Sequence, residues 1–136
     1  MHTALLSRLI LCLAVIAVAT PAVAWSPPND GALDVLLADP GRLTAMLDGA
    51  NAEQAADVVR RAIAKVDASG LNEEQKKTVI ALLVANTVAA MGGDAAETIA
   101  RLAESVPRNR LQLVVAAAVT AAGDAAAVIR DAVIAR

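Results

Sequence analysis

Along residues 51–136, apolar side chains recur at the three- and four-residue spacing of an α-helix, in stretches separated by polar or glycine-containing breaks. The pattern predicts five helices, over residues 52–68, 73–91, 95–105, 110–122 and 125–136. In the first, third and fifth, the apolar residues share one stripe, as Val58, Ile63 and Val66 do in the first. We therefore expect these three helices to bury one face and expose the other.

The second and fourth predicted helices have almost no polar face. Residues 79–91 contain only Asn86 and Thr87 as strongly polar or hydroxyl-bearing side chains, and residues 113–122 contain only Thr120. A helix that is apolar on nearly all sides must be surrounded by other elements, so we expect these two helices to be central. Their apolar runs are also shorter than the about 20 residues that cross a bilayer.

Capping signals mark the predicted helix ends. Asn or Asp precedes each helix, and in four cases Gln or Glu follows three residues later, as in a capping box. The pairs are Asn51 with Gln54, Asn72 with Gln75, Asp94 with Glu97 and Asn109 with Gln112, while Asp124 has no such partner. Helix ends are predicted at left-handed glycines and at a proline, namely Gly70, Gly92, Gly93, Gly123 and Pro107.

A shift of 30 residues aligns part of this region with itself. Seven identical pairs result: Leu83 with Leu113, Val84 with Val114, Gly93 with Gly123, Asp94 with Asp124, Ala95 with Ala125, Ala96 with Ala126, and Ile99 with Ile129. The unit would be an inner helix, a Gly-Asp corner and an outer helix. The expected fold is all-α, with five main helices forming either a short stack of antiparallel helical hairpins or a compact bundle.

The first 24 residues have the layout of a secretory signal peptide. Arg8 precedes an apolar run over residues 9–19, and small residues stand one and three positions before a cut between Ala24 and Trp25. A retained membrane anchor is the alternative, but Pro21 interrupts an apolar stretch that is shorter than a membrane-spanning helix. We therefore expect export to the periplasm or secretion.

Cleavage ahead of Trp25 would remove the only histidine, His2, and the only cysteine, Cys12. The remaining chain would lack the residues on which Ser-His-Asp and Cys-His catalysis, thiol redox chemistry and imidazole or thiolate metal sites depend. Without disulfides, packing alone must hold the fold. We therefore predict a protein that is not an enzyme and takes no metal or other cofactor.

The composition favours helix and excludes one class of partner. Hydrophobic residues make up 57% of the 136 residues, 34 of them are alanine, and only 1% of the chain is aromatic. Alanine favours helices, whereas sheet sandwiches draw on aromatic and β-branched side chains. The 12 Lys and Arg are balanced by 14 Asp and Glu, so the basic surface needed to bind nucleic acid is missing.

Residues 25–50 are expected to form an extended tail followed by short helical turns. The tail is rich in prolines and turn residues, and short turns are predicted at 32–38 and 42–47. Trp25, the only aromatic residue, is either an interface anchor on this tail or a locally tucked side chain. The predicted division is a signal peptide over 1–24, this segment, and a helical domain over 51–136.

Arg108 and Arg110 form a candidate anion-binding site. They flank Asn109 beside the predicted start of the fourth helix. Free amides at a helix N-terminus and two guanidinium groups together suit a phosphate or carboxylate. The alternative is structural, with Glu104 paired to Arg108 and with Arg110 solvated.

Two acidic pairs lie one helical turn apart, Asp30 with Asp34 and Glu53 with Asp57. Carboxylates at this spacing offer oxygen ligands to calcium, but no loop in the sequence has the alternating acidic ligands and glycine of a calcium hand. We expect Asp57 to pair with Arg61, four residues on, and assign no metal site.

Three polar groups in the second predicted helix are expected to be structural. Thr87 should bond back to its own helix, and Asn86 must find a partner if it is buried. Glu73 and Lys77 are spaced four residues apart, which favours an ion pair.

The last predicted helix carries a candidate interface. Val128, Ile129 and Val133 belong to its expected core stripe, whereas Ile134 projects from the far side. A terminal helix without a polar cap exposes apolar surface in a stacked array, which favours self-association or a partner. The interface candidates are therefore these four residues, with the alternative that Ile134 is a single exposed aliphatic side chain.

These observations favour an exported small helical-repeat protein with a non-catalytic binding or structural role in the cell envelope or outside the cell. We expect its partner to be another protein or a second copy of the chain, docked on helix faces. The competing class is a membrane-surface helical protein, which predicts liposome binding and is disfavoured by the low positive charge.

Overall fold

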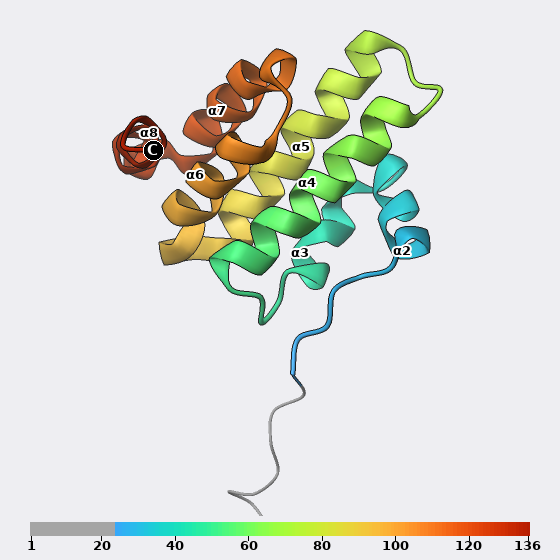
Figure 1. Cartoon of the computed structure of the whole chain (residues 1–136), viewed down its shortest axis with the longest axis horizontal. Coiled ribbons are helices and arrows are strands. Elements are labelled where there is room, and N and C mark those ends of the chain that lie inside the picture. Colours follow the sequence, from blue (N-terminus) through green and yellow to red (C-terminus); the bar gives the residue numbers. More distant parts are fainter. Residues whose placement is uncertain (1–23) are drawn as a thin grey trace, which may run out of the picture.

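The computed structural model describes residues 24–136, in which every regular element is helical (Figure 1). The elements are α2 (Asp30–Asp34), η1 (Val35–Leu37), η2 (Pro40–Arg42), α3 (Leu43–Met46), α4 (Ala52–Ala68), α5 (Glu73–Met91), η3 (Gly92–Asp94), α6 (Ala95–Ser105), α7 (Arg108–Ala122), η4 (Gly123–Ala125) and α8 (Ala126–Ile134). The prediction of an all-α fold with five main helices is confirmed. The predicted signal peptide lies, apart from Ala24, outside the described residues.

The five main helices form two hairpins and a closing helix. α4 and α5 make the first hairpin and α6 and α7 the second, with α4 packed along α6 and α5 packed along α7. The starts of α5 and α7 are joined by an ion pair between Glu73 and Arg110. α8 packs across α6 and α7 and is seen end-on in Figure 1, while the short helices α2 and α3 lie against α4 and α5 at the other end.

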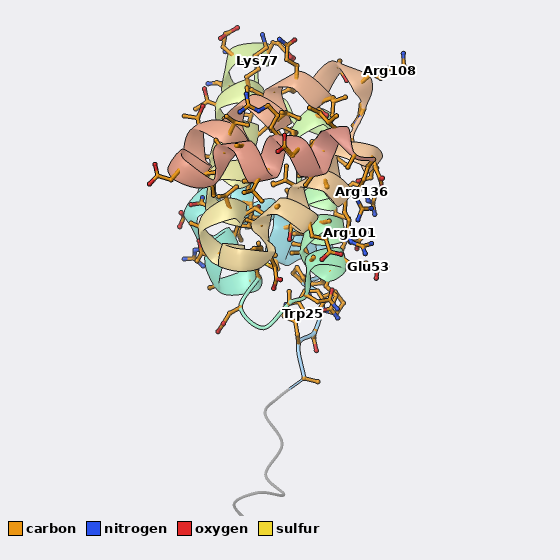
Figure 2. All side chains as sticks on the ribbon, turned by 90° about the vertical axis from the view of Figure 1, so that its left-hand side faces the viewer. Trp25, Glu53, Lys77, Arg101, Arg108 and Arg136 are labelled. Carbon is orange, nitrogen blue, oxygen red and sulfur yellow. The ribbon has the colours of Figure 1, made fainter. Side chains whose placement is uncertain are left out.

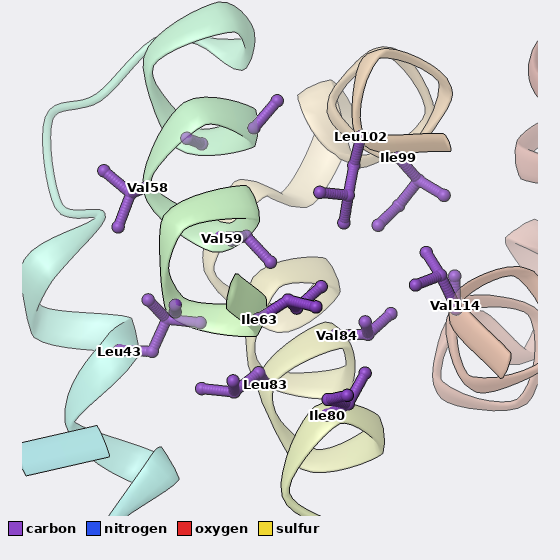
Figure 3. Close-up of a cluster of buried hydrophobic side chains, with 14 of the residues drawn as sticks. Leu43, Val58, Val59, Ile63, Ile80, Leu83, Val84, Ile99, Leu102 and Val114 are labelled. Carbon is purple, nitrogen blue, oxygen red and sulfur yellow. The ribbon is translucent and has the colours of Figure 1, made fainter. Parts of the chain in front are cut away.

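The core lies where the α4/α6 layer faces the α5/α7 layer (Figure 3). The apolar stripe predicted for the first main helix is buried as expected, with Val58, Val59 and Ile63 each at most 1% exposed. Ile80, Leu83, Val84, Ile99, Leu102 and Val114 complete the centre from the other helices. Each buried methylene contributes about 0.8 kcal/mol, so these aliphatic side chains supply most of the stabilisation.

Two predicted capping boxes are present. The side-chain oxygen of Asn51 accepts a hydrogen bond from the Gln54 amide at 2.8 Å, and Gln54 Oε1 accepts one from the Asn51 amide at 2.9 Å. Asn72 and Gln75 make the same two bonds, at 2.8 and 3.1 Å. These boxes fix the first residues of α4 and α5 where the sequence predicted them.

The other three predicted caps are wrong. Asp94 and Asp124 lie within the 3-10 turns η3 and η4, which lead directly into α6 and α8, so neither has the extended backbone of an N-cap. Asn109 lies inside α7, because that helix begins two residues earlier than predicted, directly after Pro107. The proline holds Val106 in an extended conformation and so ends α6 as expected.

Gly92 and Gly123 end α5 and α7 with nearly the same left-handed backbone, at φ +52° and ψ −118° and at φ +56° and ψ −114°. Equivalent points of the two corners are therefore 31 residues apart, whereas the identical sequence pairs are 30 apart and align Gly93 with Gly123. The sequence match is one residue out of register with the corners, and the repeat stays a prediction. Gly70 is not left-handed, because Ser69 bonds back to the last turn of α4 instead.

Residues 24–29 have no regular secondary structure, whereas the short helices that follow contribute to the core. These helices lie close to the predicted turns, and they bury Leu33, Leu36, Leu43 and Leu47 to at most 2% exposure. Trp25 is half-buried, and its indole nitrogen donates a hydrogen bond to a backbone carbonyl of α3 at 2.9 Å. Trp25 is therefore tucked against this segment at the base of the molecule (Figure 2).

The expectation that both apolar helices are central holds for α5, against which α3, α4, α6 and α7 pack, and is wrong for α7. In α7 only Arg110, Val114 and Ala118 are buried, and in α5 the side chain of Leu82 is 47% exposed. These neighbours leave one side of each helix uncovered. The opposite, equally apolar faces of α5 and α7 therefore lie on the surface of the molecule.

Candidate functional site

Arg110, in the first turn of α7, is 3% exposed and fully engaged by carboxylates. Its Nη2 and Nε donate to Asp67 Oδ1 at 2.6 and 3.0 Å, and its Nη1 donates to Glu73 Oε1 at 2.6 Å. Asp67 lies in the last turn of α4, and Glu73 begins α5. The cluster therefore fastens three helix ends together, and the planar guanidinium suits this two-sided contact.

The cluster is not arranged for proton transfer. The hydrogen bonds from Arg110 lower the pKa of Glu73 below its ordinary value, although desolvation opposes the change. The bonds to Glu73 and Asp67 raise the pKa of the Arg110 guanidinium. Arg110 and Glu73 are therefore both charged at neutral pH, whereas an acid or base catalyst needs a pKa near the working pH.

The candidate anion site is divided by the fold. Arg110 is buried against Asp67 and Glu73, whereas Arg108 is exposed at the upper end of the molecule in Figure 2. Glu104, the partner expected for Arg108, instead pairs with Arg136 at 3.4 Å. The guanidinium of Arg110 donates to the carboxylates of Asp67 and Glu73, where the sequence suggested that it would bind an anion from solution.

A groove runs between α5 and α7 on the open side of the α5/α7 layer. It has a volume of about 520 Å³ and is lined by Thr78, Ala81, Leu82, Ala85, Leu113, Ala116, Ala117, Thr120 and Ala121. We call this the α5/α7 groove. Five alanines form most of its lining, and Leu82 stands out as its most exposed large side chain.

The α5/α7 groove offers little polar chemistry. None of its lining residues is charged. Thr78 Oγ1 donates to the Glu74 carbonyl at 3.0 Å, and Thr120 Oγ1 donates to the Ala116 carbonyl at 2.8 Å. Because both hydroxyl protons are used within their own helices, a ligand in the groove would meet an almost wholly apolar surface.

The groove continues into a second hollow of about 420 Å³ between the corners that follow α5 and α7. Ala121 lines both spaces, and Val88, Gly92 and Val128 line the second. The apolar surface therefore extends along α5 and α7 as far as the start of α8.

The structure separates the four interface candidates of α8. Ile129 is 1% exposed and belongs to the core, and Val133 is half-buried against it. Val128 and Ile134 are exposed, at 61% and 76%. Val128, expected on the core stripe, instead faces the hollow beside the α5/α7 groove.

The polar residues within α5 have structural roles. Thr87 donates to the Leu83 carbonyl at 2.7 Å, as predicted, and Asn86 donates to the Pro40 carbonyl at 3.0 Å. The expected pair of Glu73 with Lys77 is absent, because Glu73 turns to Arg110. Lys77 lies 3.7 Å from Glu74 instead.

The acidic pairs also serve packing. Asp30 and Asp34 of α2 pair with Arg61 and Lys65 of α4 at 3.2 and 2.9 Å, which fastens α2 to α4. Asp57 pairs with Arg60, three residues on, and not with Arg61 as expected. Within residues 24–136, no group of three or more His, Cys, Asp or Glu side chains is placed to hold a metal ion.

Two stretches, Glu73–Ser105 and Arg108–Ile134, each counted across a corner, are long and apolar enough to cross a membrane by length and composition alone. They exceed the lengths expected from sequence because each includes two helices joined by a 3-10 corner, η3 or η4. Core helices of soluble proteins meet the same criterion. Of the most apolar 18 residues in each stretch, 39% and 17% are fully buried.

The sequence reasoning missed the α5/α7 groove, although the signal was present. The absence of a polar face on two neighbouring helices indicates either burial or an exposed apolar surface, and only the arrangement of layers decides between them. Comparisons of the chain with protein-family models, with curated proteins and with solved structures found no match.

Proposed function

We propose that this chain is an exported, non-catalytic helical protein with a binding or structural role in the cell envelope or outside the cell, and that the α5/α7 groove is its binding surface. The observation that carries the proposal is the uncharged apolar lining of the groove beside the 47% exposed Leu82. Contiguous apolar surface on a water-soluble fold marks an interaction site, because exposing it to water is unfavourable.

The shape of the groove suits a helix. From Thr78 to Ala89 the open side of α5 is about 16 Å long, which is about three helical turns. Its alanines allow the backbone of another helix to approach closely, as in helix-in-groove recognition. We therefore propose a protein partner that docks through a helix face.

A membrane-surface role is the second candidate, because the stretch Arg108–Ile134 is apolar and only 17% of its most apolar window is fully buried. Interfacial helices usually carry Lys and Arg beside their apolar face. The groove has no charged lining residue, which favours a protein partner over an anionic lipid surface.

The binding proposal is tested by placing a photo-crosslinking amino acid at Leu82 in the producing cell, with exposed Ala64 of α4 as the control position. We expect protein adducts at Leu82 and not at Ala64. Equal labelling at both positions, or none at Leu82, would contradict the binding surface. Export is tested on the recovered protein by N-terminal sequencing, which should begin at Trp25.

The membrane alternative is tested in parallel by flotation of the recovered protein with liposomes of neutral and of anionic lipid. Our proposal predicts that the protein stays at the bottom of the gradient in both cases. Flotation that is abolished by Leu82→Lys would assign the same surface to lipid instead.

A further inference from the structure

We infer that the folded domain closes the bond between Ala24 and Trp25 to signal peptidase, so that this bond is cut before residues 25–30 dock on the helices. The inference rests on the proposed function, whose export and cleavage ahead of Trp25 it uses, and adds the order in which cleavage and folding occur. The contacts that hold the first residues after the cut support it.

Trp25, the first residue after the cut, is fastened to the domain. Its indole nitrogen donates to the carbonyl of Met46 at 2.9 Å, and the ring packs against the hydrophobic core as a partly buried side chain. Its Cβ is 3.9 Å from the place that a Cβ at Gly49 would take, in the turn between α3 and α4. The root of the side chain, as well as its tip, therefore lies against the base of the molecule (Figure 2).

A second anchor follows three residues later. Arg61 of α4 donates to the carbonyl of Pro28 at 3.1 Å and pairs with Asp30 at 3.2 Å. Between the two anchors, Pro27 and Pro28 restrict the backbone to a narrow range of φ. Residues 25–30 therefore form a stiff segment held at both ends, which we call the N-terminal strap.

Proteolysis needs a stretch of chain that can leave the folded surface. An endopeptidase holds residues on both sides of the scissile bond inside its cleft, which is why exposed and flexible segments are cut most readily. Ala24 is exposed, but Trp25, on the other side of the bond, is held against the turn between α3 and α4. Cleavage of a folded chain is therefore limited to the molecules in which the strap has opened.

The position of the anchors along the chain sets the order of events. The acceptor at Met46 and the donor at Arg61 lie 21 and 33 residues beyond the parts of the strap that they bind. The strap cannot dock until α3 and α4 have formed, and a chain that is still unfolded offers the bond without obstruction. The chain is therefore cut while unfolded, and the strap closes afterwards.

The fluorescence of Trp25 reports docking of the strap directly, because Trp25 is the only aromatic residue in the chain. We expect its emission to lie at shorter wavelength in the folded chain than in urea, both before and after cleavage. An emission typical of water-exposed indole in the folded, uncut chain would overturn the inference.

Cleavage of the full chain of 136 residues by purified signal peptidase in detergent micelles tests the protection. Ala62→Asp puts a carboxylate at a 1% exposed position of α4 and should unfold the chain, whereas Ala64→Asp, two residues on, is at an exposed position and should not. Both variants keep the sequence around the cut. We expect the wild type and Ala64→Asp to be cut at least about tenfold more slowly than Ala62→Asp, in step with the folded fraction measured by circular dichroism. Equal rates for folded and unfolded chains would overturn the inference.

Trp25→Ala, introduced into the Ala62→Asp and the Ala64→Asp chains, tests whether the strap causes the protection. Comparing the folded with the unfolded chain of this variant cancels any preference of the peptidase for the residue after the cut. We expect the folded Trp25→Ala chain to be cut nearly as fast as the unfolded one. Protection that persists without the indole would overturn the role of Trp25.

The same assay separates the inference from the proposed function. If the unfolded Ala62→Asp chain is not cut ahead of Trp25, the proposed export signal fails and the inference fails with it. If that chain is cut there and the folded wild type is cut equally fast, the inference alone is overturned and the export proposal stands.

Discussion

Arg110 Nη2 lies 2.6 Å from Asp67 Oδ1, a contact that joins the start of α7 to the end of α4 across 43 residues of sequence. The arginine is much less exposed than its acidic partners. Only 4% of the Arg110 side chain is accessible, against 29% for Asp67 and 56% for Glu73. Water can replace the arginine around the carboxylates more easily than it can replace the carboxylates around the arginine. The loss of stability should therefore depend on whether the arginine or the acids are removed.

Removing the arginine is therefore expected to cost less than removing both acids. Arg110→Met keeps the apolar packing of the side chain and leaves two carboxylates that can hydrate, so we expect a loss of about 1 kcal/mol. The double variant Asp67→Ala with Glu73→Ala leaves the guanidinium of Arg110 without either partner, so we expect a larger loss than for Arg110→Met. Urea unfolding followed by circular dichroism measures both, and the reverse order would contradict the assignment.

The same cluster predicts a dependence of stability on pH. Because Arg110 lowers the pKa of Glu73, the ionised carboxylate contributes stability above the pKa that Glu73 has in the unfolded chain. That contribution is lost as the pH falls through the lower pKa of the folded state. The stability difference between wild type and Glu73→Gln should therefore be largest near neutral pH and should shrink in acid. A difference that stays constant from neutral to acid pH would argue against the ion pair.

The capping boxes give a matched pair of variants. Asn51→Ala removes the acceptor of the Gln54 amide and should cost about 1 kcal/mol. Asn109→Ala, in the exposed first turn of α7, removes no cap and should change stability by less than about 0.5 kcal/mol. Thermal unfolding of the two variants compares them, and equal losses would count against the capping role of Asn51.

The sequence predicted the helices well because their signals are local. The boxes at Asn51 and Asn72 and the stop at Gly92 act within a few residues, and the bounds of α4, α5 and α6 match the prediction. The caps expected at Asp94 and Asp124 failed because 3-10 turns let α6 and α8 follow without an extended residue. The spacing of Asp94 and Glu97 does not distinguish an extended N-cap from a residue in a 3-10 turn.

The candidate site is formed by contacts between residues far apart in the sequence, which local residue spacing cannot predict. Arg110 was expected to be solvated or to bind an anion, and only the fold brings it to Asp67, 43 residues away. Likewise, the apolar stretch around Leu82 predicted burial, and only the number of helix layers decides whether its outer face is covered.

The glycine corners predict opposite results at neighbouring positions. A Cβ added at Gly92 or at Gly93 would meet nothing within 4 Å, so the two sites differ mainly in backbone geometry. Gly92 has φ +52°, and Gly92→Ala should therefore cost about 1 to 3 kcal/mol of backbone strain. Gly93→Ala should be neutral or stabilising by up to about 1 kcal/mol. Equal effects in urea unfolding would contradict the left-handed corner.

The measurement that tests the open α5/α7 face most directly is thiol labelling of Leu82→Cys against its neighbour Leu83→Cys, with Cys12 replaced by serine in both. Leu82 is 47% exposed and Leu83 is fully buried. We predict rapid labelling at position 82 and protection at position 83. Protection of position 82, or equal rates at both positions, would contradict the account.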